Sequence, residues 1–583
     1  MPTLTRREFL KVSTLTAGAL SVSFGLTGCS DSDGNNTGNA NSRVVEFQHG
    51  VASGDPLSDS VMLWTRITPL DEGGSISVNW EVARDAAFTD LTHDGQMTAS
   101  AAHDYTVKID VRNLLPGTRY YYRFRAAGIS SPTGITATLP LTTDQVRLAV
   151  VSCSNYPAGY FHAYAAIADQ ADSQMLDAVL HLGDYLYEYG MGGYATDAAE
   201  ALGRTLPEDN ATELLTLTDY RKRYALYRTD TDLQSLHARL PWIVVWDDHE
   251  VTNDAWESGA ENHNEGEGDF TARKYQALQA YFEWLPIRPA REDDKETIYR
   301  SFRFGDLVAL QMLDTRIIAR DEQLDYANYV VSDGHLDTSS LVSDLTDPTR
   351  ELLGDAQQLW LQSAVTESLS LRWQVLGQQV LMARMALPAE LLLQLQEVYA
   401  GKADASTLQS LISEYIELKQ RQAQGDTLSA SEQSRLDTVL PYNLDAWDGY
   451  SAARERTLAI FQQAGSNLVV LAGDTHNAWA SLLTRQDGTA VGVEFAVSSV
   501  SSPGLESYLG DLDSDTLAQA LTVLIDDLRY ANLSQRGFMI VDFTHAEARA
   551  AWYFIDTVKS RDYSLIEGPV WRTPAGSVSL EAV

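Results

Sequence analysis

LPWIVVWDDHE, residues 240–250, joins a run of apolar residues directly to a run of charged ones. An apolar run of this length is typical of a strand that is buried on both faces of a sheet. Charged residues that follow such a strand lie at its carboxyl end, where ligands gather in open α/β sheets. This stretch therefore predicts an α/β fold with a functional site at one edge of the sheet.

Three further stretches repeat this arrangement of a buried strand followed by polar residues. Each has a simpler interpretation alone: Asp184 could be a turn residue, Asp247 a helix cap and His476 a hydrogen-bonded buried histidine. Four such arrangements in one chain indicate a metal site instead, because their side chains are of the types that bind metals. The stretches are VRLAVVS (146–152) before Cys153 and Asn155, LDAVLHLGDYLYE (176–188) with Asp184 and Tyr187, the DDHE stretch with Asp247, Asp248, His249, Glu250 and nearby Asn253, and SNLVVLAGDTHNAW (466–479) with Asp474 and His476.

An all-β segment precedes the α/β pattern. Its apolar and polar residues alternate between clusters of Gly, Pro and Asp. LLPGTRYYYRF resembles the corner of fibronectin- and immunoglobulin-type domains, where a tyrosine bonds back to the backbone, a role that Tyr120 or Tyr122 would fill. The sequence predicts a fibronectin/immunoglobulin-like β-sandwich over residues 43–141, followed by an α/β sandwich over 145–583.

The N-terminal residues have the pattern of an export signal. Adjacent Arg6 and Arg7 stand ahead of an apolar stretch, as in twin-arginine signals. LTGC, which ends at Cys29, resembles a bacterial lipobox, whose cysteine receives enough acyl chains for stable membrane anchoring. We therefore expect residues 1–29 to be a twin-arginine lipoprotein signal with Cys29 as the lipidated residue, and residues 30–42 to be a flexible tether.

Charge and cysteine content narrow the possible partners. The formal net charge of −37 argues against nucleic acid held on a basic surface. It says little against a small anionic substrate, because bound cations can invert the local field. The chain has two cysteines. If Cys29 carries lipid, Cys153 has no disulfide partner.

The polar blocks after the strands resemble those of the calcineurin-like metallophosphoesterases, and among these the alkaline phosphatase D (PhoD) family. The similarity runs in the family's order from about Phe47 to the C-terminal segment. It implies that the α/β sandwich is a metallophosphoesterase domain. The blocks are Gly183-Asp184-x-x-Tyr187, Asp248-His249-Glu250 and Gly473-Asp474-x-His476, with further matches at GVASGDP (50–56), SVMLWTRI (60–67), RYALYRTDTDLQSLHARLPWIVVWDDHE (223–250), MLDTR (312–316) and DAWDGY (445–450).

The candidate ligands fall into two chemical sets. A thiol and a phenol bind well at neutral pH only to a strong Lewis acid, so the first set suits Fe³⁺. The second set is almost entirely oxygen, which suits a hard cation, and we expect Ca²⁺. The resemblance implies the same iron–calcium cofactor. The iron set is Cys153, Asp184, Tyr187 and His476; the calcium set is Asp184 as a bridge, Asp248 and Asp474, with Asn253 as a weaker candidate.

These sets predict hydrolysis of phosphate esters by a metal-bound hydroxide, with phosphate held at the calcium site. His249 is expected to protonate the leaving alkoxide or to orient the phosphate; holding Asp248 in place is the alternative. We expect Glu250 to orient His249. Arg316 and Arg454 could contact phosphate oxygens or form structural ion pairs.

Three segments depart from the simple strand pattern. Residues 387–440 read as a largely helical insertion, which leaves lid geometry and substrate choice open. The acidic stretch 257–269 reads as a mobile loop, with a second calcium site or a lid as alternatives. Residues 514–530 and 537–556 read as a helix and a closing pair of strands, and the resemblance implies that this C-terminal segment caps the active site.

The expected function is an extracytoplasmic phosphomonoesterase or phosphodiesterase that scavenges phosphate. A lipid anchor facing the periplasm or the cell exterior would also suit a phospholipase or a cell-wall-polymer phosphodiesterase. A surface-binding lipoprotein without catalysis is a third possibility, and the intact candidate ligand set argues against it.

Overall fold

The structure is a computed structural model, which describes residues 44–71, 74–291, 294–331, 336–399, 402–509 and 512–583. The expected export signal, Cys29 and the tether lie outside these residues. Within the described ranges, no helix is both long and apolar enough to cross a bilayer.

Two large sheets form the centre of the molecule. In the first, β11, β12 and β13 run parallel to one another and confirm three of the predicted strands. The order of this ten-stranded sheet is β28 (Glu581–Ala582), β27 (Leu565–Pro574), β26 (Glu547–Ile555), β25 (Arg536–Thr544), β11 (Gln145–Val151), β12 (Ala178–His181), β13 (Pro241–Val244), β2 (Val51–Gly54), β3 (Ser60–Arg66) and β7 (Thr106–Arg112).

The second sheet contains the fourth predicted strand, β21, which runs parallel to both of its neighbours. Its seven strands are, in order, β16 (Arg300–Phe304), β17 (Val308–Met312), β18 (Trp373–Gln378), β21 (Leu468–Ala472), β23 (Ala490–Ala496), β22 (Ala478–Thr484) and β24 (Leu528–Asn532).

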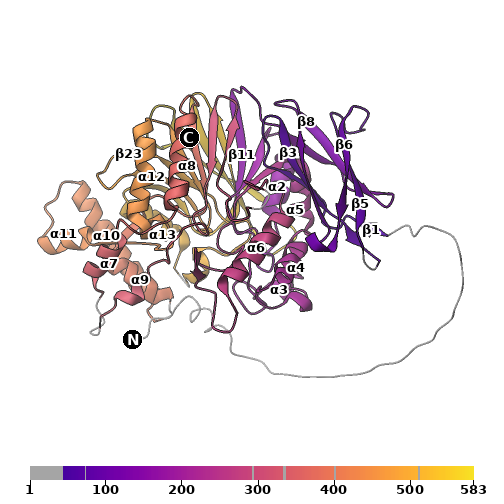
Figure 1. Cartoon of the computed structure of the whole chain (residues 1–583). Helices are drawn as coiled ribbons and strands as arrows, with labels where there is room; N and C mark the ends of the chain where they lie inside the picture. Colours follow the sequence, from indigo (N-terminus) through magenta and orange to yellow (C-terminus); the bar gives the residue numbers. More distant parts are fainter. Residues whose placement is uncertain (1–43, 72–73, 292–293, 332–335, 400–401, 510–511) are drawn as a thin grey trace, which may run out of the picture.

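The sheets pack face to face and helices cover their outer faces (Figure 1). Trp552 of β26 crosses between them, because its indole N–H donates to the carbonyl oxygen of Ala496 in β23 at 3.0 Å. Helices α2 (His162–Gln170) and α5 (Thr231–Arg239) contact the ten-stranded sheet, whereas α8 (Gly354–Glu367) and α12 (Ser451–Ala464) contact the other. This arrangement confirms the predicted α/β class.

The N-terminal strands have a hydrophobic core of their own, and they also pair with the larger of the two central sheets. Three of them, β2, β3 and β7, extend the ten-stranded sheet, because β2 pairs in parallel with β13. The fibronectin/immunoglobulin-like topology stays a prediction. The other N-terminal strands are β1 (Val45–Glu46) paired with β4 (Thr68–Pro69), and a five-stranded sheet of β10 (Gly134–Ala137), β8 (Arg119–Ala126), β5 (Ile76–Ala83), β6 (Leu91–Ala99) and β9 (Ile129–Ser130).

A tyrosine corner forms at the predicted place. The Tyr120 hydroxyl accepts the backbone N–H of Leu115 at 2.8 Å, so Tyr120 rather than Tyr122 fills this role. The Tyr122 ring is fully buried in the core beneath it. The corner closes the turn before β8 and fixes how that strand enters its sheet.

The insertion is helical, as predicted, and stands at the opposite end of the molecule from the N-terminal strands (Figure 1). Its base is the antiparallel pair β19 (Ala386–Pro388) and β20 (Val439–Pro441), and its helices are α9 (Ala389–Tyr399), α10 (Ala405–Ala423) and α11 (Ala430–Asp437). Helix α13 (Ser514–Leu524) packs against α10 and β24. The predicted closing strands are β25 and β26, and the C-terminal cap over the active site stays a prediction.

The remaining elements connect these layers. The acidic stretch carries part of a short hairpin, so it is not an irregular loop throughout. The connecting elements are α3 (Ala199–Leu202), α4 (Leu217–Tyr227), β14 (Ala255–Trp256), β15 (Gly259–Ala260), α6 (Phe270–Trp284) and α7 (Thr338–Leu345), with 3₁₀ turns η1 (Ala101–His103), η2 (Glu208–Asn210), η3 (Tyr326–Tyr329), η4 (Trp447–Tyr450) and η5 (Leu505–Tyr508).

Candidate metal centre

The turns that carry the predicted ligands share an unusual backbone conformation. Cys153, Asp184, Asp474 and His476 have φ angles of 60°, 56°, 60° and 59°. Side chains other than glycine rarely adopt this left-handed region, and such residues concentrate at functional sites. The left-handed conformation therefore recurs at the ends of β11, β12 and β21.

Two glycines allow these turns to approach one another. Gly183 has a φ of 104°, and a Cβ atom placed there would lie 2.4 Å from the Cβ of Asp247. A Cβ on Gly473 would lie 2.9 Å from the Cβ of Ser152. Gly473 follows β21 of the seven-stranded sheet, whereas Ser152 follows β11 of the ten-stranded sheet. Any larger residue would push the turns apart, so both glycines are needed for the close packing of the ligand loops.

The four predicted iron ligands lie together. One potential ligand atom each from Cys153, Asp184 and His476 lies within 4.8 Å of the others. The Tyr187 hydroxyl lies 3.2 Å from Asp184 Oδ2 and 3.0 Å from His476 Nε2. Thiol, carboxyl, phenol and imidazole groups from three separate loops thus converge on one point.

Two neighbours prepare these groups for ligation. His476 Nδ1 lies 2.8 Å from the carbonyl oxygen of Pro503, so Nδ1 carries the proton and Nε2 keeps its lone pair. The Ser502 hydroxyl donates to the Tyr187 oxygen at 2.7 Å, which favours the charged phenolate. Ser502 and Pro503 lie in the loop after β23, and no spacing in the sequence indicated them.

A second group of carboxylates overlaps the first through Asp184. Ligand atoms of Asp184, Asp247, Asp248 and Asp474 all lie within 4.8 Å of one another. Asp247 is an addition to the predicted set. It does not cap a helix, because only a turn follows it. Its position directly after a buried strand is the same signal that identified Asp184.

This donor set fits bound cations. Burial raises the pKa of the Asp184 carboxyl well above its ordinary value; the His249 charge opposes this rise, and the neighbouring carboxylates add to it. Asp184 Oδ1 and Asp247 Oδ2 are buried without a hydrogen-bond partner, as are both amide atoms of Asn155. Buried carboxylates that crowd in this way require compensating positive charge.

The pKa values of the Cys153 thiol and the Tyr187 phenol are also raised. Burial, followed by the charge of Asp184, raises the pKa of both the Cys153 thiol and the Tyr187 phenol well above their ordinary values. Both groups would therefore hold their protons at neutral pH in the protein alone. A strongly Lewis-acidic cation displaces such protons on binding.

Arg316 lies within the carboxylate group as an ion-pair partner. Its side chain is fully buried, and its Nε donates to Asp247 Oδ1 at 2.5 Å. The same guanidinium pairs with Asp445 at 2.8 Å and lies 3.6 Å from Asp474. Arg454 instead donates to the carbonyl oxygens of Met382 and Thr484, outside both donor groups. The contacts of both arginines match structural ion pairing and packing.

His249 lies against the cluster and is oriented by Glu188. A ligand atom of His249 lies within 4.8 Å of those of Asp184 and Asp248. His249 Nδ1 lies 2.7 Å from Glu188 Oε2. Burial opposes the charged imidazolium, but Asp248 and the other nearby carboxylates outweigh burial and raise the pKa of His249 well above its ordinary value.

The prediction that Glu250 orients His249 is therefore wrong. Glu250 bonds backbone N–H groups instead, whereas the fully buried Glu188 contacts the imidazole. Glu188 follows Tyr187 directly, so the loop that carries Asp184 and Tyr187 also carries the partner of His249. A charged residue inside the aromatic run YLYEYG was the available signal for it.

Glu188 also ties the acidic stretch to the site. It accepts the backbone N–H of Asn253 at 2.9 Å and the side-chain amide of Asn262 at 2.8 Å. The Asn253 amide donates to Glu261 Oε2 at 3.2 Å, so its role as a calcium ligand stays a prediction. The acidic stretch contributes hydrogen bonds that hold His249 and its partner in place.

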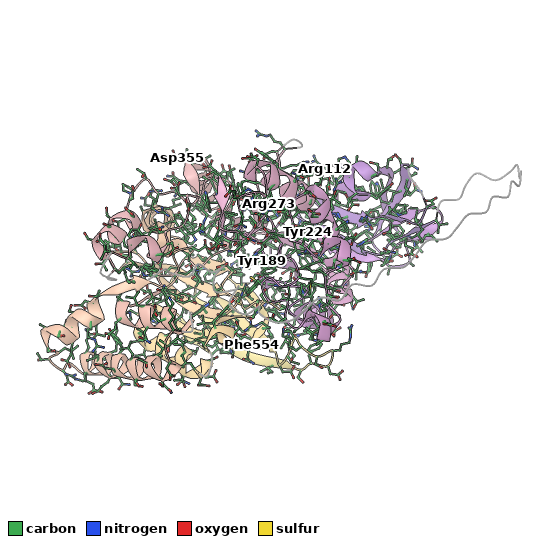
Figure 2. All side chains as sticks on the ribbon, turned by 90° about the horizontal axis from the view of Figure 1, so that it is seen from below. Arg112, Tyr189, Tyr224, Arg273, Asp355 and Phe554 are labelled. Carbon is green, nitrogen blue, oxygen red and sulfur yellow. The ribbon has the colours of Figure 1, made fainter. Side chains whose placement is uncertain are left out.

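Two tyrosines flank the open side of the centre. Tyr189, Tyr194, Asp474 and His476 are half-buried, whereas the candidate ligands Cys153, Asp184, Tyr187 and Asp248 are buried. The Tyr189 ring centroid lies 5.6 Å from that of His249, and the Tyr194 ring lies 6.2 Å from His476. Figure 2 places Tyr189 near the middle of the molecule, between the N-terminal strands and the helical insertion.

Comparisons with known proteins give matches along most of the chain. The PhoD-like phosphatase family model matches residues 148–552, and the model of the PhoD-like phosphatase N-terminal domain matches residues 31–140. The chain is 36% identical over 522 residues to alkaline phosphatase D of Bacillus subtilis (strain 168), covering 86% of this chain and 77% of that protein. A solved structure of PhoD superposes with a TM-score of 0.73 at 30% identity and covers 92% of each chain.

These matches extend over both the N-terminal strands and the two central sheets. The candidate metal ligands from Cys153 to His476 all lie inside the matched phosphatase region. The chain belongs to the PhoD-like phosphatase family, and it is a phosphatase or phosphodiesterase rather than a binding protein without catalysis.

Proposed function

We propose that the protein hydrolyses phosphate mono- and diesters outside the cytoplasm, using bound cations, and that it scavenges phosphate. One observation carries this proposal: two donor groups of different chemistry overlap at Asp184. A shared carboxylate between a sulfur-, phenol- and imidazole-containing set and an all-carboxylate set suits two unlike cations. Enzymes that transfer phosphoryl groups use such paired cations to hold both the attacking and the leaving oxygen.

We assign Fe³⁺ to the first donor group and Ca²⁺ to the second. Cys153, Tyr187 and His476 would hold the iron, and Asp248 and Asp474 the calcium, with Asp184 between them. Asp247 belongs to the same group of carboxylates, so it would either bind the calcium directly or hold Arg316 in place through their ion pair. Such a pair supplies Lewis-acid polarisation of the phosphate and of the attacking water.

The protein's own groups supply position and a proton. Glu188 accepts the Nδ1–H of His249, which directs Nε2 away from Glu188. His249 can then donate its Nε2 proton to the leaving oxygen of an ester held over Asp184 and Asp248. The half-buried Tyr189 lies beside His249, where the leaving alcohol would depart. Arg316 lies close to both Asp247 and Asp474 and offsets part of their charge.

Metal analysis of the purified protein, combined with assays on three substrates, tests this function. We expect iron and calcium together with activity on a chromogenic phosphate monoester or diester. Higher activity on phospholipid vesicles than on either small ester would favour a lipid-directed hydrolase. Zinc as the sole bound metal in a fully active enzyme would contradict the cation assignment.

Cys153→Ser is expected to shift the visible absorption of the purified enzyme and to weaken iron retention. Thiolate and phenolate bound to ferric iron absorb visible light by charge transfer, so the wild-type protein should be coloured. Tyr187→Phe should shift the band differently because it removes the other absorbing ligand. Absorption spectra and iron content of the three proteins measure this. A Cys153→Ala protein with unchanged iron, colour and rate would show that Cys153 only fills space in the core.

Export and anchoring give a separate prediction. Arg6→Lys combined with Arg7→Lys should leave full-length protein in the cytoplasm, because the twin-arginine pair is the element read for export. Cys29→Ser should release the protein from the membrane, because the acyl chains have no attachment point. Cell fractionation followed by immunoblotting measures both. Cys29→Ser protein that remains in the membrane fraction would contradict the lipid anchor.

A further inference from the structure

One buried carboxylate connects the two turns that carry Asp184 and Asp247. Oε2 of Glu250 accepts the backbone N–H of Asp184 at 3.1 Å and that of Asp247 at 2.8 Å. Its other oxygen, Oε1, accepts the backbone N–H of Tyr185 at 2.5 Å. Glu250 is fully buried. A single oxygen atom therefore bridges the ends of β12 and β13, beyond the last hydrogen bond of their ladder.

The conformation of the first turn suits an anion at this place. Gly183 and Asp184 both have positive φ angles, of 104° and 56°. A turn of this kind can direct successive N–H groups to one side, and such a concavity binds anions. Charge-assisted bonds of a carboxylate to N–H groups are about twice as strong as neutral ones. Through its three bonds to backbone N–H groups, Glu250 can thus hold the strained turn in the shape that ligation needs.

We propose that Glu250 is a positioning residue for the metal centre, which holds the Asp184 and Asp247 turns in ligating geometry before any cation binds. The proposal rests on the metal centre described under the proposed function. All three of these bonds are made to backbone N–H groups, so Glu250 acts on the path of the chain and leaves the carboxylates of Asp184 and Asp247 available. Glu250 thus contributes a fixed backbone conformation to the metal centre rather than an additional charged ligand.

Glu494 in β23 offers a matched control. It is 1% exposed and accepts the backbone N–H groups of Met382 and Ala383 at 2.6 and 2.9 Å. Burial raises the pKa of the Glu494 and Glu250 carboxyls alike. Glu494 lies outside both donor groups. The two residues therefore share burial and bonding but differ in whether the backbone they hold carries metal ligands.

The first experiment compares Glu250→Gln with Glu494→Gln. Glutamine keeps one acceptor oxygen, but its amide nitrogen must face an N–H group, and the negative charge is lost. We expect both variants to lower the Tm by similar amounts. Glu250→Gln should also lose bound metal to a chelator about 10- to 100-fold faster, which is the range for removing the support of a metal ligand. Glu494→Gln should release metal at the wild-type rate.

Equal metal-release rates in the two variants would overturn the proposal. Such a result would show that Glu250 only stabilises the fold, as Glu494 does. The measured quantities are the metal content per protein, the half-time of metal loss in excess chelator, and the Tm of the metal-free proteins. None of them depends on the activity of the loaded enzyme.

The second experiment needs no variant and covers the case in which Glu250→Gln does not fold. Amide hydrogen exchange of the metal-free wild type should show protection at Asp184, Tyr185 and Asp247. Protection of these amides only in the metal-loaded protein would show that the cation shapes the turns, which overturns the proposal. A protein that binds metal but has no esterase activity would instead contradict the proposed function and leave this test intact.

Discussion

Asp184→Asn is expected to abolish measurable hydrolysis of phosphate esters and to remove both cations from the purified protein. Asp184 is the one carboxylate shared by the two donor groups, and its Oδ1 is buried without a protein partner. Asparagine preserves the shape of the side chain but donates hydrogens where cations need lone pairs. Cation stabilisation of the transition state is worth several kcal/mol, and each 1.4 kcal/mol is tenfold, so the rate should fall by at least about 10³-fold.

Asp230→Asn provides the matched control for this substitution. Asp230 is a buried carboxylate that caps α5 and pairs with Arg204 at 2.7 Å, away from the donor groups. Its substitution should lower the Tm with little change in metal content or kcat. Metal analysis and steady-state kinetics of both variants measure the difference. An Asp184→Asn enzyme that keeps both cations and most of its rate would show that Asp184 is not the bridge.

His249→Ala is expected to lower kcat by about 10²- to 10⁴-fold on alkyl phosphates, which is the usual contribution of a positioned acid. The loss should be much smaller on nitrophenyl esters, because nitrophenolate leaves without a proton. The contrast between the two substrates separates proton donation from support of Asp248, since weaker support of Asp248 would slow both substrates equally. Equal losses at unchanged metal content would assign His249 to positioning.

A substitution of Glu188 tests proton donation by His249 in a second way. Its carboxylate lies 2.7 Å from His249 Nδ1, so Glu188→Gln should disturb the orientation of the imidazole and lower kcat on alkyl phosphates. In the His249→Ala background the same substitution should add little, because its partner is absent. Fully additive losses in this double-mutant cycle would show that Glu188 acts independently of His249.

Most of the ligand set could be predicted from short stretches of the chain. Apolar runs such as that of β13 reveal buried strands, and a polar residue at the end of such a strand must lie at the sheet edge. Cys153, Asp184 and His476 were found in this way, and the structure brings them together. Asp247 carried the same signal, but a helix cap explained it equally well until the turn after it was known.

The partners of these ligands could not be predicted in the same way. Glu188 and His249 are 61 residues apart, and Ser502 and Tyr187 are 315 apart. Which side chain faces His249 depends on how the loop after β12 lies against the loop after β13, and no local pattern records that packing. The expectation for Glu250 failed for this reason, because proximity in sequence to His249 was the only guide.

The sequence by itself determined the strands and the chemical types of the candidate metal donors, because these follow from hydrophobic pattern and residue type. Tertiary structure alone decided that Asp247 joins the carboxylate group, that Glu188 holds His249 and that Glu250 holds the backbone of the ligand turns. These are choices among several carboxylates of the same chemistry. Only the packing of the loops at the strand ends, which brings residues distant in sequence within hydrogen-bond distance, distinguishes one carboxylate from another.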